Sequence, residues 1–386
     1  MIKNLSRSLK KHFNLHFSRA KCLEEMISGL IKAGSVQLFR IGEEFSNVTS
    51  SVETHRRRIQ NFIKADNILH DEDLASYILA LLNQGQKLIL AIDRTNWKFG
   101  ETIHNLFVLA VVIDNNAVPL FILPLDHMGN SDTQQRIMLI SSFINLFGVD
   151  CIDCITGDRE FVGDDWIEWL CEHDVPFVMR CRENIGFKHP NGGKMLVSKW
   201  FSPTNEEEVQ VKTSIGKHPI HLTGKAIKHK PDKIKKTSKK RKKSLKESNK
   251  TDKKKEKSHE LLVVMSSVSI KNPLQTYKKR WGIECLFKGL KSHGFDLELS
   301  HIKNQGSFLT LVKVVCLAFA ISFSAGLALQ HEKPIPFRKT VNSKLLSVFR
   351  YGMDFLKRNF KNHQRKITCV FYGFKGVHKI LGIFVT

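Results

Sequence analysis

The sequence is poor in the features that mark secreted and disulfide-bonded proteins. Its eight cysteines among 386 residues are too few for a disulfide scaffold. Cys151 and Cys154 form the one close pair, and no second pair accompanies them to complete a zinc site, so we interpret them as small buried residues. The basic N-terminus lacks the apolar stretch of a signal peptide, and we therefore expect a cytoplasmic protein with reduced thiols.

Long hydrophobic runs are also scarce. The longest, Val314–Leu329, includes Ser322, Ser324 and Gly326, and it is short for a bilayer span, which needs about 20 apolar residues. We expect a buried helix of a large core and no membrane insertion.

Acidic residues are in deficit, because 37 Asp and Glu face 61 Lys and Arg, which gives a net charge of +24. This excess favours a polyanionic partner, with nucleic acid first and an anionic membrane surface second. A membrane-surface protein would need an amphipathic anchor, which the sequence lacks. A lysine-rich run at 225–258 supplies about half of the charge. It has almost no apolar residues, so we expect it to be disordered. A run of this kind is usually a solvated loop, and loose, salt-dependent contact with DNA is the alternative.

Residues 1–80 are predicted to be a helical domain. Ser35–Phe45 and Ser51–Lys64 are typical of two helices joined by a short turn, and the second carries Arg56, Arg57 and Arg58. A helix-turn-helix would place these arginines on DNA. A solvated basic helix of a small bundle fits the same pattern.

Residues 85–183 are predicted to form a mixed sheet with helices packed on it. Three apolar runs indicate buried strands, and Asn115-Asn116 marks the turn between the last two. A helix over Ser131–Gly148, with Ser131 as N-cap and Gln134 completing a capping box, should follow. The expected strands are Lys87–Asp93, Leu106–Asp114, Val118–Leu125, Cys151–Thr156 and Pro176–Cys181, with a second helix at Asp164–His173.

The rest of the chain is less uniform. Residues 184–272 are irregular up to the strand expected at Glu260–Ile270. Residues 273–332 are expected to hold two long helices, Leu274–Ser292 and Ser307–Glu332. The basic tail 333–386 gives no interpretable pattern.

Two aspartates stand beside predicted strands. Asp93 closes the first strand and Asp158 follows the fourth. If these strands are neighbours, both carboxylates lie at one edge of the sheet, and convergent carboxylates are the oxygen ligands that Mg²⁺ prefers. An Asp after a strand is more often a turn or helix-cap residue than a metal ligand, so each aspartate alone is weak evidence for a metal site.

The predicted helix Leu274–Ser292 carries a polar stripe. Tyr277, Arg280, Glu284 and Lys291 fall within about 60° of one another at about 100° per residue. The two cations and the phenol could contact successive DNA phosphates while the one acid, Glu284, reaches a metal. An exposed face laced with ion pairs is the alternative, since Arg280 and Glu284 are four residues apart.

The pattern Tyr-x2-Arg-x3-Glu-x6-Lys in YKKRWGIECLFKGLK resembles the signature of bacterial insertion-sequence transposases of the Tyr-Arg-Glu-Lys (YREK) subclass of Asp-Asp-Glu (DDE) enzymes. The segments AIDRTNWKFG and ITGDREF resemble that family around its first two aspartates. The resemblance spans roughly residues 30 to 330. It implies an α/β RNase H-like mixed sheet flanked by helices (85–183 and 273–332), an inserted, mainly β region (184–272) and a helical N-terminal DNA-binding domain (1–80). The lysine-rich run departs from the family pattern.

The resemblance also implies roles for single residues. Asp93, Asp158 and Glu284 would be the catalytic acids and the ligands of Mg²⁺, or of Mn²⁺ in its place. Tyr277, Arg280 and Lys291 would contact phosphates of the transposon end. Trp281 would stack on an extruded base; packing in the core or at its rim is an equally good interpretation.

The expected function is that of a cut-and-paste DNA transposase acting in the bacterial cytoplasm at the nucleoid. Its partners would be double-stranded DNA, both transposon-end inverted repeats and target DNA, and a second copy of the chain in a synaptic complex. The cleaved 3′-OH would attack the opposite strand to form a hairpin or attack target DNA directly. The alternatives are an RNase H-like nuclease without strand transfer and an inactive transposase-derived DNA-binding protein.

Overall fold

A computed structural model describes residues 4–82, 87–189, 192–201, 205–228, 259–338, 340 and 343–363. Its centre is a mixed eight-stranded sheet with the strand order β3-β2-β1-β4-β5-β10-β9-β8. The strands are β1 (Leu88–Phe99), β2 (Thr102–Ile113), β3 (Asn116–Leu125), β4 (Ile152–Gly157), β5 (Phe177–Arg180), β8 (Val209–Ile215), β9 (His218–Lys228) and β10 (His259–Ser267).

The first five strands follow the predicted order, β-β-β-α-β-α-β. β1, β2 and β3 form an antiparallel meander, whereas β4 is parallel to β1 and β5 is parallel to β4. The helices α6 (Thr133–Phe147) and α7 (Asp164–Glu172) connect the later strands. This confirms the predicted fold class, a mixed sheet flanked by helices.

Some local predictions were displaced by a residue or more. The turn between β2 and β3 has positive φ angles at Asp114 and Asn115, not at Asn115-Asn116. The capping box of α6 consists of Asp132 and Gln135, because Ser131 is buried and accepts a hydrogen bond from Arg136 instead.

The cysteine prediction holds for one residue of the pair. Cys154 is buried in β4 as expected. Cys151 lies in the 3₁₀ turn before that strand (η1, Val149–Cys151) and is half-buried.

The inserted region extends the sheet. After β5 come a small hairpin of β6 (Gly186–Lys188) and β7 (Lys194–Leu196) and the short helix α8 (Val197–Trp200). β10 then pairs antiparallel with β5 on one side and with β9 on the other. The predicted start of disorder at residue 225 is wrong, because 225–228 is the paired end of β9; residues 229–258 lie outside the described residues.

The N-terminal part is helical, as predicted. Its helices are α1 (Asn4–His12), α2 (Phe17–Ala33), α3 (Leu38–Glu43), α4 (Val52–Ile63) and α5 (Asp71–Leu82). α3 and α4 are the two helices expected around the basic segment, and they pack closely enough for the His55 ring to bond to the Gly42 carbonyl at 3.0 Å.

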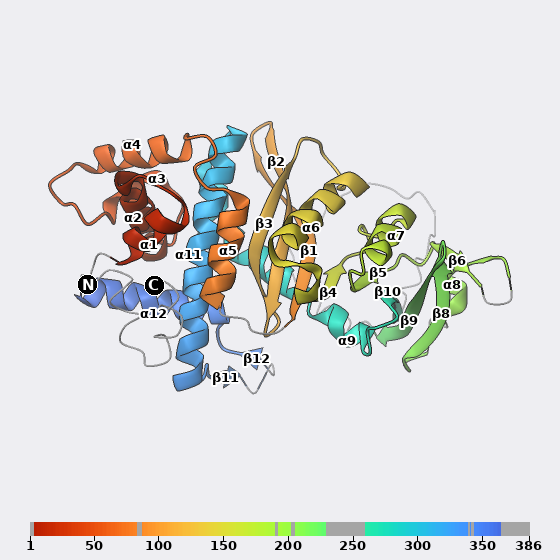
Figure 1. Cartoon of the computed structure of the whole chain (residues 1–386). Coiled ribbons are helices and arrows are strands. Elements are labelled where there is room, and N and C mark those ends of the chain that lie inside the picture. Colours follow the sequence, from red (N-terminus) through yellow and green to blue (C-terminus); the bar gives the residue numbers. More distant parts are fainter. Residues whose placement is uncertain are drawn as a thin grey trace, which may run out of the picture.

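The long helix α11 (Gln305–Glu332) lies between α1 to α4 and the sheet, whereas α5 packs directly on β3 (Figure 1). It packs against α2, α5 and β3. By length and composition it is the one described helix that could cross a membrane, yet 89% of its most apolar window is buried inside the protein. Its apolar character is therefore explained by packing on several sides, as the sequence analysis expected.

The C-terminal tail contains structure that the sequence did not indicate. A short hairpin, β11 (Phe337–Arg338) and β12 (Ser343–Lys344), precedes α12 (Val348–His363), which packs along α11. A Cβ atom on Gly352 would lie 1.9 Å from the Ser322 carbonyl oxygen, and one on Gly326 would lie 2.1 Å from that of Val348. The two glycines therefore let the helix backbones meet.

Candidate active site

The register between β1 and β4 brings the first two acids together. Ile92 pairs with Gly157, the last residue of β4, so Asp93 and Asp158 occupy the next position on adjacent parallel strands. The prediction that Asp93 closes its strand is wrong. β1 continues to Phe99 because β2 remains paired with it, and Asp93 lies opposite Val108.

The segment that carries Glu284 is two helices, not the single helix predicted over Leu274–Ser292. α9 (Pro273–Lys278) ends before α10 (Trp281–Lys291) begins. Lys279 and Arg280 keep right-handed backbone angles, and the tighter bonds Gly282 N–H to Lys279 O and Ile283 N–H to Arg280 O replace a regular helical turn. The break is narrow enough that the side chains at 277, 280 and 284 still meet.

One guanidinium lies between two of the three acids. Arg280 donates from Nη1 to Asp93 Oδ2 at 3.3 Å and from Nη2 to Glu284 Oε1 at 2.6 Å. Its Nε donates to the Tyr277 hydroxyl at 3.2 Å, and that hydroxyl donates to Asp158 Oδ1 at 3.2 Å. Tyr277 and Arg280 are each only 7% exposed. A single buried network therefore joins all three predicted acids.

Burial and neighbouring charges shift the pKa values of Asp93 and Arg280 in this network. Burial raises the pKa of Asp93 to about 6, and the carboxylates of Glu160 and Asp158 add to the rise, while Arg280 and a backbone N–H oppose it. Burial works against the charge of Arg280, but Tyr277, Asp158, Glu284 and Asp93 raise its pKa overall. The site thus concentrates negative charge that one arginine partly compensates.

These residues fit a divalent cation by chemistry. Asp93, Asp158 and Glu284 offer hard oxygen donors in a cluster that already attracts a positive charge. Among the described residues, no three Asp, Glu, His or Cys side chains stand close enough to hold one ion, and the Arg280 guanidinium lies between Asp93 and Glu284. Binding of an ion by all three acids would therefore require Arg280 to withdraw.

The other candidate residues of α10 lie beside this network. Lys291 is half-buried with its Nζ 5.3 Å from the centre of the Trp97 ring, and burial lowers its pKa. Trp281 is 55% exposed, with Lys288 Nζ 5.0 Å above its ring. Of the two readings of Trp281, the exposed ring leaves base stacking open and argues against burial in the core.

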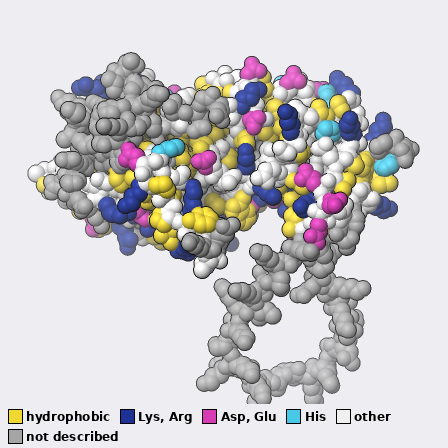
Figure 2. All heavy atoms as spheres, turned by 90° about the horizontal axis from the view of Figure 1, so that it is seen from below, with side chains coloured by type: hydrophobic (Ala, Val, Ile, Leu, Met, Phe, Trp, Pro, Cys, Tyr) yellow, Lys and Arg dark blue, Asp and Glu magenta, His cyan; other side chains and the backbone are white. Residues whose placement is uncertain are grey.

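The three arginines of α4 lie away from the acids, on the far side of α11 (Figure 1). Arg56 and Arg57 donate to Glu53 at 2.7 and 3.1 Å, and Arg58 lies over the Phe45 ring. Elsewhere Lys and Arg are spread along the molecule among acidic side chains, as the face in Figure 2 shows.

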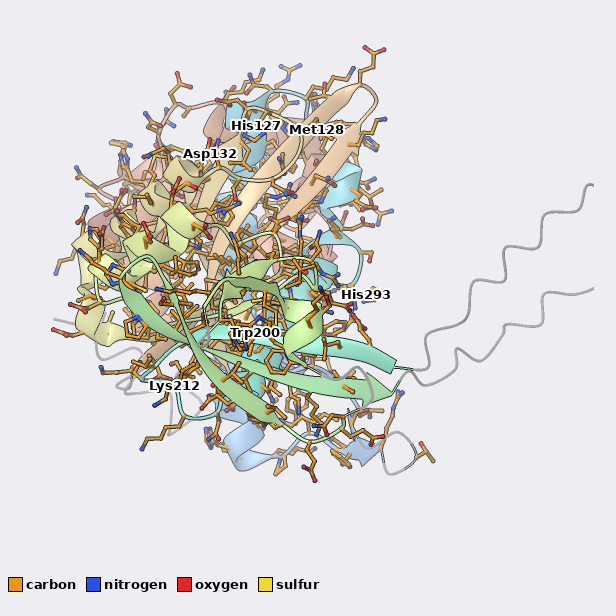
Figure 3. The ribbon with its side chains drawn as sticks, turned by 90° about the vertical axis from the view of Figure 1, so that its right-hand side faces the viewer. His127, Met128, Asp132, Trp200, Lys212 and His293 are labelled. Carbon is orange, nitrogen blue, oxygen red and sulfur yellow. The ribbon has the colours of Figure 1, made fainter. Side chains whose placement is uncertain are left out.

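The sequence did not indicate a role for the residues that follow the two aspartates. Arg94 Nε and Nη2 donate to the two carboxylate oxygens of Glu160 at 2.8 and 2.9 Å. Arg94 also reaches Asn130, in the loop between β3 and α6 that carries His127, Met128 and Asp132 in Figure 3. The available signal was the charge complementarity of the residues next to the acids, DR and DRE, in two segments predicted to be neighbours.

Comparison with known protein families gives a match over the candidate site. A family model described as "Transposase DDE domain" matches residues 84–320, which is more than half of the chain and includes Asp93, Asp158 and Glu284. No curated protein matches the chain.

Proposed function

Because the chain belongs to the family of transposases with a DDE domain, we propose that Asp93, Asp158 and Glu284 are its catalytic acids and that it cuts and rejoins DNA at the ends of its own element. The observation that carries this proposal is the buried Arg280–Tyr277 network, which gathers those three acids from β1, the end of β4 and α10. We further propose that the core is RNase H-like and that the chain belongs to the YREK subclass.

The three acids would hold two divalent ions, Mg²⁺ or Mn²⁺. Such ions activate a water molecule and stabilise the leaving oxygen of a phosphodiester. The chain's own contribution is to fix the Asp93 and Asp158 carboxylates at the sheet and Glu284 on α10, and to exclude water around Asp93. Positioning of this kind supplies much of the rate of phosphoryl transfer.

The reaction has two balanced steps. Water attacks the phosphorus at the transposon end, its P–O bond forms as the bond to the 3′ oxygen breaks, and the 3′ oxygen leaves as a hydroxyl. That 3′-OH then attacks a second phosphodiester, on the opposite strand to form a hairpin or on target DNA. The new bond from phosphorus to the attacking 3′ oxygen forms as the bond to the neighbouring nucleotide's 3′ oxygen breaks, and that oxygen leaves as a hydroxyl.

The remaining polar residues would bind the DNA. Lys291 and, once displaced from the acids, Arg280 would contact phosphates, with Tyr277 holding Asp158. Trp281 would stack on an extruded base, and Arg56, Arg57 and Arg58 of α4 would hold the transposon end. Two ends must be joined, so the active form would be a dimer on double-stranded DNA.

The proposal is tested with a duplex that carries the element's own terminal sequence. Asp93→Asn, Asp158→Asn and Glu284→Gln should each lower the rate of strand cleavage in Mg²⁺ by at least about 1,000-fold, because about 4 kcal/mol of transition-state stabilisation is lost. All three should still bind the duplex. Asp150→Asn, an acid in the turn before β4, is the matched control and should cleave normally.

A strand-transfer assay with precut ends separates the two enzymatic candidates. A transposase joins the precut 3′-OH to a second duplex, and a nuclease without strand transfer gives no joined product. Wild-type chain that binds the duplex but does not cleave it with Mg²⁺ or Mn²⁺ would identify an inactive DNA-binding relative, and normal cleavage by Asp93→Asn would refute the assigned acids.

A further inference from the structure

A second ion pair lies beside the catalytic acids, and the proposed chemistry does not use it. Arg94 directly follows Asp93 in β1, and Glu160 stands two residues after Asp158. Two parallel hydrogen bonds of 2.8 and 2.9 Å join them, and their side chains are 17% and 18% exposed. Paired, planar geometry of this kind is the strong form of an ion pair.

Neighbouring side chains hold both partners in place. Arg94 Nη1 donates to Asn105 Oδ1 at 3.3 Å and Nη2 to Asn130 Oδ1 at 2.9 Å. Asn105 is 3% exposed, and its amide donates to the His127 and Gly129 carbonyls at 2.9 and 3.2 Å. The Arg94 guanidinium is therefore fixed on two sides besides its contact with Glu160.

The segment that carries Asp158 is fixed in a similar way. The buried Arg136 of α6 donates to the Glu160 carbonyl oxygen at 3.1 Å and to the Ser131 carbonyl oxygen at 2.6 Å. The backbone after β4 is consequently attached to α6 by Arg136 and to β1 by Arg94. Asp158 lies one residue beyond the last paired residue of β4, Gly157. The two arginines therefore fix the backbone segment that carries it, while the Tyr277 hydroxyl donates to its carboxylate.

We propose that Arg94 is a positioning residue, which holds Glu160 so that the Asp93 and Asp158 carboxylates keep the separation needed to share a divalent ion. The pairing also occupies both oxygens of Glu160, a carboxylate that would otherwise compete with Asp158 as a ligand. This inference rests on the proposed function, because it concerns metal binding by the same acids.

The test removes the Arg94–Glu160 ion pair (the clamp) without changing the net charge of the site. Arg94→Gln combined with Glu160→Gln deletes one positive and one negative charge together. Mn²⁺ binding to the full chain, without DNA, is followed by the electron paramagnetic resonance signal of the free ion. We expect the dissociation constant to rise at least about 10-fold, the range found when groups that orient metal ligands are lost, and the Mn²⁺ concentration for half-maximal cleavage to rise with it.

A remote ion pair supplies the control. Lys313 of α11 donates to Asp71 of α5 at 3.1 Å and is 8% exposed, so Lys313→Gln with Asp71→Asn also deletes a buried pair at constant charge. It should lower stability and leave Mn²⁺ affinity within about twofold. Arg94→Lys covers the case in which the double variant does not fold, since it keeps the charge but cannot donate two parallel bonds; we expect a smaller loss of affinity.

Unchanged Mn²⁺ affinity in the Arg94/Glu160 double variant, or in Arg94→Lys if only that variant folds, would overturn the inference. If wild-type protein binds Mn²⁺ and Asp93→Asn does not, the proposed function stands whatever the clamp does. If wild-type protein binds no Mn²⁺ and does not cleave, the proposed function fails and the inference with it.

Discussion

Arg280 has a different setting from the one that the sequence suggested. A polar stripe on an exposed helix would leave this side chain in water, but it is 7% exposed and bonded to Asp93, Glu284 and Tyr277. The guanidinium thus provides the counter-charge for the acids where a cation would otherwise be needed. Contact with DNA phosphates, as proposed, requires it to exchange one set of partners for another.

Arg280→Met should make folding depend on metal. Loss of the guanidinium leaves two partly buried carboxylates without a partner, which we expect to cost about 2 kcal/mol of unfolding free energy in metal-free buffer. Mg²⁺ should restore most of this loss, so the metal-induced rise in melting temperature should be larger than in wild type. Arg280→Lys, which keeps the charge, should lie between the two. An equal metal-induced rise in all three proteins would contradict the counter-charge role.

The raised pKa of Asp93 predicts a pH dependence of stability. Between its ordinary value near 4 and about 6 in the folded protein, the folded chain holds more protons than the unfolded chain. The contribution of Asp93 is therefore most favourable below about pH 4 and is lost as pH rises through about 6, by about 3 kcal/mol in total. Urea unfolding of wild type and Asp93→Asn in metal-free buffer should give curves whose difference changes over this window.

The same titration should appear in metal binding. A divalent ion binds the ionised carboxylate, so Mg²⁺ should stabilise wild type less as pH falls through about 6. A stability difference between wild type and Asp93→Asn that stays constant from pH 4 to 7 would show that the carboxyl titrates normally.

At the scale of elements, the sequence predicted which strands and helices exist better than where they end. The apolar runs identify β1 to β5 because burial on both faces requires them. The end of β1 was wrong because pairing with β2 sustains the strand through polar residues such as Asn96, which lies opposite Asn105. The sequence did not indicate the break between α9 and α10 because Lys279 and Arg280 are ordinary helix residues. At this break Arg280 bonds to Asp93, which is distant in sequence.

Gly282 fixes α10 against the sheet. A Cβ atom there would lie 2.9 Å from the Asn115 carbonyl oxygen, in the β2–β3 turn, and 3.0 Å from the Ala117 nitrogen, at the start of β3. Gly282→Ala should therefore push α10 outward and move Glu284, two residues on, away from Asp93. We expect cleavage to fall by about 10-fold to 100-fold, with a loss of about 1–3 kcal/mol in unfolding free energy from overpacking.

Gly306→Ala is the matched control for that change. A Cβ atom on Gly306, in the first turn of α11, meets only Asn304 Oδ1 at 3.6 Å, so alanine should leave cleavage unchanged and slightly stabilise the helix. Thermal unfolding and the cleavage assay, run on both variants, distinguish displacement of α10 from a general effect of replacing glycine. Normal cleavage by Gly282→Ala would mean that Glu284 tolerates the shift.

At the scale of the molecule, the sequence indicated a helical N-terminal part and a sheet, and both are present. It did not indicate how they join. α11 contacts α2, α5, β3 and α12, and such all-round burial gives an apolar run without the one-sided periodicity from which neighbours are inferred. Nor did the sequence indicate how the inserted, mainly β region joins the core. β10 pairs with β5 and makes the region continuous with the central sheet, and such pairing depends on residues that are distant in the chain.

The proposed division of labour places DNA binding on α4 and cleavage across α11 from it, and this can be tested through charge. Arg56→Ala, Arg57→Ala and Arg58→Ala should each weaken binding of a terminal-repeat duplex and lower the slope of log affinity against log salt by about 1 if the residue contacts a phosphate.

Glu53 supplies the control, because its negatively charged carboxylate accepts hydrogen bonds from Arg56 and Arg57. Glu53→Gln should therefore shift affinity in the opposite direction, because it frees both arginines and removes a negative charge from the same face. Binding is measured by fluorescence anisotropy at salt concentrations from about 50 to about 300 mM. We expect the affinities of these variants to span a range of about 10-fold. If the arginine variants and Glu53→Gln all bind as wild type does, α4 is a solvated helix of the N-terminal bundle, and the transposon end must be held by another surface.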